Sequence, residues 1–298
     1  MEPMHLFYSR SRALILDWKC FRFRRFSSLS VNMSEPHLMY AAHTMRRRII
    51  CHVGPTNSGK THAALQALMS SKSGVYCGPL RLLAWEVSES LRSKNVPCDL
   101  VTGQERDKME GSNFVACTIE MLDTSVQYEA GIIDECQLIG DFSRGWAWTK
   151  ALLGMQARVI HLCGSPSMQD IVRKLSIRMG TEMEVITYNR LSPLNVGEKA
   201  LKNYKNIRKG DCVIGFSRKV LYDIKRQIEA ANRDLRCCII YGNLPPAARK
   251  EQARLFNEEN SGYDVLVASD AIGICILDSI MLVVEGSLSF LLHFQAWD

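Results

Sequence analysis

One run of eight residues has the composition and spacing of a phosphate-binding loop. It matches the pattern G-x-x-x-x-G-K-[ST] in full and consists of Gly54, Pro55, Thr56, Asn57, Ser58, Gly59, Lys60 and Thr61. An apolar run precedes it and a helical pattern follows, which is the context that distinguishes this motif from a chance match in a turn. Backbone N–H groups and the helix N-terminus would hold the phosphates, while Lys60 would reach the β- and γ-phosphates. With the hydroxyl of Thr61 as a ligand of Mg²⁺, the motif predicts a site for ATP and Mg²⁺.

Two adjacent carboxylates end another apolar run. Residues 130–133 read Ala-Gly-Ile-Ile, and Asp134 and Glu135 follow directly. Beside a phosphate-binding loop, the first acid of such a pair holds Mg²⁺ through water, and the second orients or deprotonates the attacking water. We assign these roles to Asp134 and Glu135, and we expect Gln137 to link the site to a neighbouring domain. Without the loop at Lys60, the same pair would be interpreted as a solvated strand end.

These residues are embedded in an alternation of short apolar runs and helical stretches. The runs predict strands at 49–53, 74–77, 114–117, 131–134 and 158–162, and helices at 60–69 and 80–92. A break rich in Pro, Gly and Asn occupies 188–197, after which strands are predicted at 211–215, 236–241 and 263–268. Helices are predicted at 218–231 and after Pro245 and Pro246. This pattern favours an α/β fold of mostly parallel sheets with helices on both faces, divided into a leader (1–45), a first domain (46–188) and a second domain (189–298).

The composition is ordinary for a globular protein of two domains. Hydrophobic residues make up 47% and charged residues 23% of the 298 residues, and the net charge of +6 permits a nucleic-acid partner without requiring one. The eleven cysteines contain no C-x-x-C pair, so we expect neither a zinc site nor a disulfide framework. Asp278 and Glu285 interrupt the apolar stretch 272–294, and we therefore expect no membrane span.

The first thirty residues differ from the remainder of the chain. They are poor in acids and contain six basic residues, Arg10, Arg12, Lys19, Arg22, Arg24 and Arg25, followed by several serines. This composition is typical of an organelle transit peptide, and its arginine content favours the mitochondrial matrix over a plastid. A disordered basic tail, translation from Met33 and a nuclear location are the alternatives.

The motifs together resemble one helicase family. Asp134-Glu135-Cys136-Gln137 resembles the D-E-x-Q box of superfamily-two helicases, and the segments 73–84, 101–106 and 161–166 surround it in the chain. In combination they resemble the mitochondrial Suv-three (Suv3) RNA helicases, over residues 46–273. The resemblance implies a P-loop NTPase fold with two RecA-like domains, and ATP hydrolysis coupled to the unwinding of RNA. It also implies a mitochondrial exoribonuclease as partner, with DNA and RNA–DNA duplexes as open alternatives to RNA.

The resemblance also implies which residues grip one RNA strand. Such contacts, largely from backbone amides and hydroxyls to phosphates, suit binding without sequence preference. The implied residues are Pro79, Arg81, Thr102, Gly103 and Thr118 in the first domain, and Ser217, Arg218, Gly242, Ser269 and Asp270 in the second.

Other interpretations of these residues remain open. Arg81 could be a solvated charge at a helix start, Thr102-Gly103 a plain turn, and Ser217 a helix cap. We interpret His161 as a core residue of its strand. Trp146 and Trp148 are interpreted as packing residues and not as platforms for bases.

The sequence departs from the family pattern after Gly273. No Q-x-x-G-R-x-G-R box is present, and we expect the second domain to be incomplete. Because arginines of that box are expected at the γ-phosphate, hydrolysis and unwinding by this chain would be slow. The first alternative to a helicase is therefore a catalytically impaired nucleotide- and RNA-binding form that modulates the full-length enzyme. A small-molecule kinase is the second, and the D-E-x-Q box argues against it.

Overall fold

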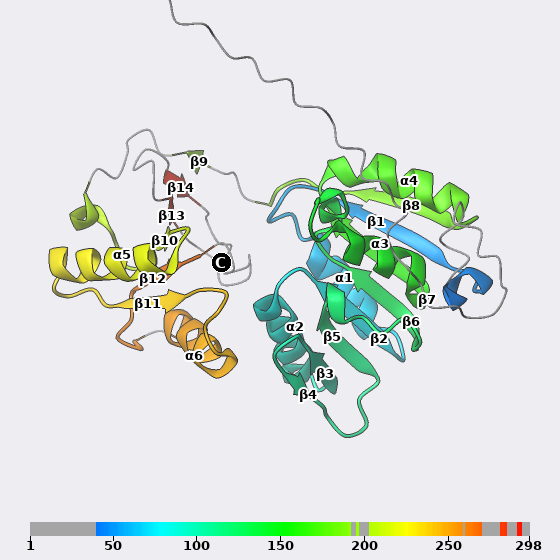
Figure 1. The fold of residues 1–298 in the computed structure, drawn as a ribbon, viewed down its shortest axis with the longest axis horizontal. Helices are drawn as coiled ribbons and strands as arrows, with labels where there is room; N and C mark the ends of the chain where they lie inside the picture. Colours follow the sequence, from blue (N-terminus) through cyan, green and yellow to red (C-terminus); the bar gives the residue numbers. More distant parts are fainter. Residues whose placement is uncertain are drawn as a thin grey trace, which may run out of the picture. The chain divides into compact units, whose positions relative to one another are not determined.

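The structure contains two β-sheets with their helices. It is a computed structural model that describes residues 40–191, 195–196, 203–258, 260–269, 281–284 and 291–293 (Figure 1). Only the backbone is described at 195–196, 281–284 and 291–293. The expected transit peptide and Asp270 lie outside the described residues.

The first sheet has eight strands in the order β4-β3-β5-β2-β6-β7-β1-β8. All neighbours pair in parallel except β3 and β4, which are antiparallel. The strands are β1 Arg48–Val53, β2 Gly74–Gly78, β3 Cys98–Val101, β4 Arg106–Asp107, β5 Phe114–Thr118, β6 Gln127–Ile133, β7 Gln156–Gly164 and β8 Glu182–Thr187. Because parallel strands end at the same edge, the residues that follow β1, β2, β3, β5 and β6 gather at one side of the sheet.

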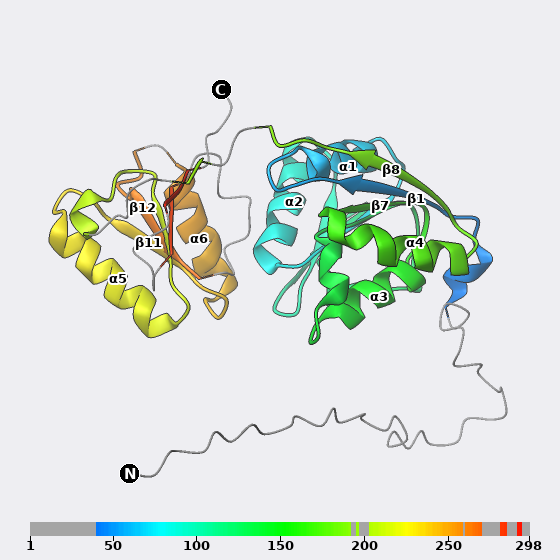
Figure 2. The same ribbon diagram turned by 90° about the horizontal axis from the view of Figure 1, so that it is seen from above.

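Four α-helices cover the two faces of this sheet. They are α1 Lys60–Met69, α2 Arg81–Ser93, α3 Gly145–Gly154 and α4 Gln169–Arg178. Successive strand residues point to opposite faces, and the two hydrophobic clusters follow that alternation. Ile133 of β6 packs in the cluster with α3 and α4, whereas Ile132 packs in the cluster with α1 and α2. Figure 2 shows the sheet between these helix pairs.

Short 3₁₀-helices connect several of these elements. They are η3 Ala41–Thr44, η4 Ile119–Met121, η5 Cys136–Gly140, η6 Pro166–Met168 and, before the second sheet, η7 Tyr204–Asn206. Ala42 of η3 is fully buried. The folded part therefore begins before residue 46, and the predicted leader at 1–45 overlaps it.

The second sheet has six strands in the order β11-β12-β10-β13-β14-β9. The strands are β9 Asn195–Val196, β10 Cys212–Ile214, β11 Cys237–Ile240, β12 Val265–Ala268, β13 Met281–Val284 and β14 Leu291–His293. Pairing is parallel from β11 to β13 and antiparallel at β14 and β9. The helices α5 Arg218–Ala231 and α6 Pro246–Asn257 pack on opposite faces, through Leu221 and Ile224 on one and Ala253 on the other.

The predicted α/β fold is thus confirmed. Helix α1 and helix α5 have the predicted bounds, and α6 begins at Pro246. Helices α3 and α4 were not predicted, and neither was the short pair β3–β4. None of the helices in the described part of the chain combines the length and the apolar composition of a membrane-spanning helix.

Candidate functional site

The predicted phosphate-binding loop joins the end of β1 to the start of α1. Gly59 precedes the helix with φ of 78°, and Asn57 has φ of 53°, so the loop turns through two left-handed residues. Such a turn directs backbone N–H groups inward, as a phosphate-binding loop requires. Lys60 is buried, and its Nζ donates a hydrogen bond of 3.0 Å to the carbonyl of Pro55. The ammonium group thus already lies across the loop.

The predicted carboxylates follow β6 and face this loop. Asp134 is 2% exposed, and the hydroxyl of Thr61 lies 3.3 Å from its Oδ1. Two further groups donate to the Asp134 carboxylate, the hydroxyl of Tyr76 at 3.0 Å and the backbone N–H of Glu135 at 2.9 Å. Burial and the neighbouring charge of Glu135 raise the pKa of Asp134 to about 6. A charged Asp134 carboxylate at this position therefore lowers the stability of the fold. Such shifted pKa values are common at functional sites.

A cavity connects these groups. It has a volume of about 200 Å³, and its lining includes Lys60, Thr61, Tyr76, Asp134 and Glu135. A carboxylate beside a threonine hydroxyl offers the oxygen ligands that Mg²⁺ prefers, so this pair fits the expected metal. The cavity is therefore lined by a cation, by two candidate metal ligands and by a second carboxylate, which are Lys60, Thr61 with Asp134, and Glu135.

Gln137 lies between the carboxylate pair and the end of β7. Its Nε2 donates to Glu135 Oε2, and its Oε1 accepts a hydrogen bond of 3.1 Å from the backbone N–H of Ser165. The approach is close, because a methyl group at Gly164 would lie 2.6 Å from Gln137 Oε1. The contacts of Gln137 therefore link Glu135, which follows β6, to the segment that follows β7. These two strands are neighbours in the same sheet.

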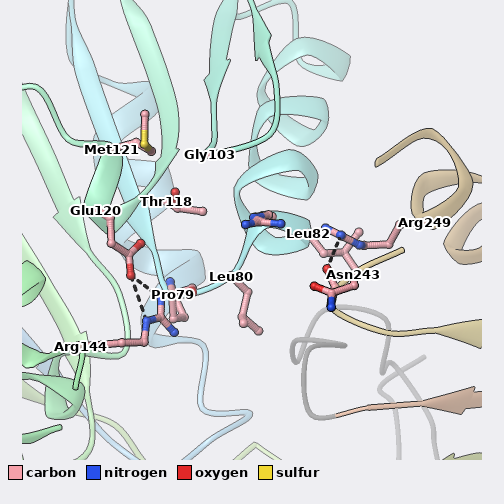
Figure 3. Close-up of a pocket in the computed structure, with 12 residues that line it drawn as sticks. Pro79, Leu80, Leu82, Gly103, Thr118, Glu120, Met121, Arg144, Asn243 and Arg249 are labelled. Carbon is pink, nitrogen blue, oxygen red and sulfur yellow. Dashed lines mark hydrogen bonds and ion pairs between the residues drawn. The ribbon is translucent and has the colours of Figure 1, made fainter. Parts of the chain in front are cut away.

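The first-domain residues predicted to grip RNA follow β2, β3 and β5. Pro79, Gly103 and Thr118 lie near one another at this edge (Figure 3). Arg81 begins α2, and a methyl group at Gly103 would lie 3.8 Å from its Nη2. Thr102 is buried, and its Oγ1 accepts from the N–H groups of residues 104 and 105. The side chain of Thr102 therefore stabilises a turn, and of these two residues Gly103 is the exposed one.

Arg144 also lies at this edge, and the sequence did not predict it. Its guanidinium donates to the Glu120 carboxylate at 2.8 and 2.9 Å and to the Pro79 carbonyl at 2.6 Å (Figure 3). Nothing local in the sequence signals these contacts, since Arg144 lies 24 and 65 residues from its two partners.

The second-domain candidates follow β10, β11 and β12. Ser217 caps α5, with its Oγ accepting from the backbone N–H of Val220 at 3.3 Å. The guanidinium of Arg218 lies 5.6 Å from the ring centroid of Tyr241. Gly242 follows β11 and Ser269 follows β12, so these residues share the carboxyl edge of their own sheet.

The sequence predicted His161 as a core residue and Trp146 and Trp148 as packing residues. The structure confirms the predictions for His161 and Trp148. His161 is buried, its Nδ1 lies 2.9 Å from Nε2 of His52, and burial followed by the charge of His52 lowers its pKa to about 4. Trp148 is fully buried, as expected. Trp146 is 57% exposed, so the interpretation of Trp146 as a packing residue is wrong. It lies two residues from Trp148 on α3 and therefore points to another side of the helix.

The chain is similar to a known helicase family. Residues 36–188 match the family described as the DEXQ-box helicase domain of Suv3. The chain is 50% identical over 262 residues to the ATP-dependent RNA helicase SUV3L, mitochondrial, of Oryza sativa subsp. japonica. It is 44% identical over 290 residues to the ATP-dependent RNA helicase SUPV3L1, mitochondrial, of Homo sapiens. These matches cover 87% and 96% of the chain but only 36% of each relative, so the chain spans about a third of their length.

A solved structure supports the fold. S. cerevisiae Dbp5 bound to RNA and ADP BeF3 matches with a TM-score of 0.53 and 15% identity, over 82% of this chain and 71% of that chain. At this identity the likeness concerns the fold alone, which is that of a RecA-like helicase core.

Proposed function

Because the chain belongs to the Suv3 family of DEXQ-box helicases, we propose that it binds ATP and RNA and couples ATP hydrolysis to the separation of RNA strands. One observation carries the proposal: Lys60, Thr61 and Asp134 surround one cavity, with Glu135 at its wall. Those groups supply the parts that phosphoryl transfer needs, namely a cation for the phosphates, oxygen ligands for a metal and a carboxylate for water.

The roles proposed for the residues follow from this arrangement. The loop from Gly54 to Thr61 would bind the phosphates, and Lys60 would exchange the Pro55 carbonyl for the β- and γ-phosphate oxygens. Thr61 and Asp134 would hold Mg²⁺, which neutralises negative charge that develops on the phosphates.

Hydrolysis would begin with water held by Glu135. The water oxygen bonds to the γ-phosphorus while the bond from that phosphorus to the bridging oxygen breaks, and ADP leaves. The water proton passes to the Glu135 carboxylate and then to solvent. Gln137 would fix the orientation of Glu135 through the hydrogen bond between their side chains.

RNA would bind at the carboxyl edges of the sheets. We propose Pro79, Arg81, Gly103 and Thr118 as contacts in a first domain at 46–188, with Thr102 holding the turn that presents Gly103. In a second domain at 189–298 the proposed contacts are Ser217, Arg218, Gly242, Ser269 and Asp270. Backbone groups and hydroxyls at strand ends can reach phosphates, and Arg218 adds a positive charge.

The family also suggests where the protein acts and with what. The two relatives described above carry mitochondrial names, and we propose the mitochondrial matrix as the location and a mitochondrial exoribonuclease as the partner. A reporter fused to residues 1–45 should enter mitochondria, and replacement of Arg22, Arg24 and Arg25 by Glu should prevent import. A cytosolic reporter would contradict this location.

ATP hydrolysis measured with and without single-stranded RNA tests the function. The proposed function requires turnover that depends on Mg²⁺ and increases with RNA. Binding of a non-hydrolysable ATP analogue and of RNA without turnover would instead support the alternative, a binding protein that modulates the full-length helicase. Absence of nucleotide binding would contradict both.

A further inference from the structure

Arg144 holds together two of the segments proposed to contact RNA. One guanidinium nitrogen donates to the Pro79 carbonyl at 2.6 Å and to Glu120 Oε1 at 2.8 Å, and a second donates to the same carboxylate oxygen at 2.9 Å. Pro79 follows β2, and Glu120 lies in η4 after β5. Figure 3 shows the Arg144 guanidinium beside Glu120 and Pro79. A shift of either segment would therefore change the hydrogen bonds of one guanidinium group.

The same guanidinium contacts Trp148, which is bonded to Asp134 of the proposed nucleotide site. Arg144 Cζ lies 5.4 Å from the ring centroid of Trp148, within the range of a cation–π interaction. Trp148 is fully buried, and its Nε1 donates a hydrogen bond of 3.0 Å to the backbone carbonyl of Asp134. Because an indole has only this one donor, rotation of the ring would break the bond to Asp134.

The start of α3 keeps Arg144 from moving independently of these contacts. The Arg144 N–H donates to Asp141 Oδ1 at 2.7 Å, and the Gly145 N–H donates to the Asp141 carbonyl at 2.9 Å. A methyl group at Gly145 would lie 2.5 Å from the carbonyl oxygen of Ile139, so α3 packs tightly against η5. Movement at Arg144 would therefore involve both α3 and the segment that follows the D-E-x-Q box.

We propose that Arg144 and Trp148 are positioning residues that couple RNA binding to nucleotide binding. The proposal rests on the proposed function, since it assumes that RNA contacts the edge at Pro79 and at Thr118, two residues before Glu120. RNA that shifts these segments would move the Arg144 guanidinium, and Trp148 would transmit the shift to the backbone that carries the Asp134 carboxylate. Neither residue needs to touch RNA or ATP for this effect.

Such coupling is a measurable free energy and is reciprocal. If RNA tightens nucleotide binding by some factor, nucleotide must tighten RNA binding by the same factor. A chain of contacts alone does not demonstrate coupling, so the test must measure this factor and not merely the loss of activity.

The first test uses Trp148→Phe, which keeps an aromatic ring but loses the N–H donor. Affinity for a short fluorescein-labelled single-stranded RNA is measured with and without Mg²⁺ and AMP-PNP, and the ratio is the coupling factor. We expect the parent protein to show a coupling factor in the usual range of about 5 to 150. Trp148→Phe should reduce this factor by at least about threefold. Each ligand alone should bind within about twofold of the parent. The matched control is Trp146→Phe, an exposed tryptophan on the same helix, and it should keep the parent's factor.

The second test uses Arg144→Lys, which keeps the charge but cannot hold the Glu120 carboxylate and the Pro79 carbonyl in the same fixed geometry. It should lose coupling as Trp148→Phe does. If Trp148→Phe does not fold, Arg144→Lys still tests the proposal. Unchanged coupling in a folded variant of either residue would overturn the proposal. Loss of RNA affinity without nucleotide in Arg144→Lys would also overturn it, because Arg144 would then be an RNA contact. If the parent binds neither RNA nor AMP-PNP, the proposed function itself fails.

Discussion

The hydroxyl of Tyr76, in β2, donates a hydrogen bond of 3.0 Å to the carboxylate of Asp134, at the end of the neighbouring strand β6. Both side chains are almost fully buried. A buried carboxylate needs several donors to remain stable, and Tyr76 supplies one from the strand that leads directly to Pro79.

Tyr76→Phe should therefore destabilise the protein. It removes the hydroxyl but keeps the ring, and loss of a donor to a buried acceptor costs about 1–3 kcal/mol. The free energy of unfolding from urea titration measures the effect. Tyr128→Phe is the matched control, because the Tyr128 hydroxyl has no hydrogen bond to any residue that the structure describes. An equal and small effect of both substitutions would show that the Tyr76 hydrogen bond contributes nothing.

Lys60→Ala should weaken binding of AMP-PNP about 10- to 100-fold, because hydrogen bonds to charged groups contribute about 1.5–3 kcal/mol. Isothermal titration calorimetry in Mg²⁺ measures the affinity directly. Lys174→Ala, an exposed lysine on α4, should bind like the parent. Unchanged affinity in Lys60→Ala would remove the basis for the phosphate-binding loop.

Stability should depend on pH through His161. Its pKa in the folded protein is about 4, whereas a histidine in an unfolded chain has a pKa of about 6.5. Between these values the unfolded chain binds a proton that the folded protein does not, so the free energy of unfolding falls as pH decreases from 6.5 to 4. The full loss is on the order of 3 kcal/mol, at 1.36 kcal/mol per unit of pKa.

His161→Gln should flatten this dependence in urea titrations at several pH values, because glutamine does not titrate. His43→Gln, at an exposed site on η3, should leave the slope of the parent unchanged. If His161→Gln also kept the parent's slope, His161 would not be the cause.

Gly145→Ala should destabilise the protein even though alanine is the better helix former by about 1 kcal/mol. The added methyl group would lie 2.5 Å from the Ile139 carbonyl oxygen, and relief of such overpacking typically costs about 1–3 kcal/mol. Thermal unfolding should show a lower midpoint for Gly145→Ala and little change for Gly140→Ala, where no atom lies within 4 Å of the added methyl group. A stabilised Gly145→Ala would mean that propensity outweighs the close contact.

The parts of the protein that the sequence predicted are those with local signals. The loop at Lys60 and the pair Asp134-Glu135 are short motifs, and their neighbouring strands carry continuous apolar runs, so strands β1 and β6 could be placed. Helix α3 was not predicted, since Gly145 and Gly154 stand at its ends and its side chains are largely apolar. Without a polar face, its sequence lacks the periodic pattern of an amphipathic helix.

Long-range contacts were beyond prediction for a different reason. The partners of Arg144 are set by where the ends of β2 and β5 meet, which depends on strand order and not on any motif. The donor from Tyr76 to Asp134 likewise depends on the pairing of β2 with β6 across 58 residues.

We propose that Glu135 activates water for ATP hydrolysis beside Lys60 and Asp134. Phosphate release by Glu135→Gln, measured with Mg²⁺, ATP and saturating single-stranded RNA, tests it most directly, because glutamine keeps the shape but cannot accept the proton. We expect AMP-PNP to bind as it does to the parent while phosphate release falls by about 100-fold or more, the usual contribution of a general base. Phosphate release at the parent's rate would show that Glu135 does not activate the water.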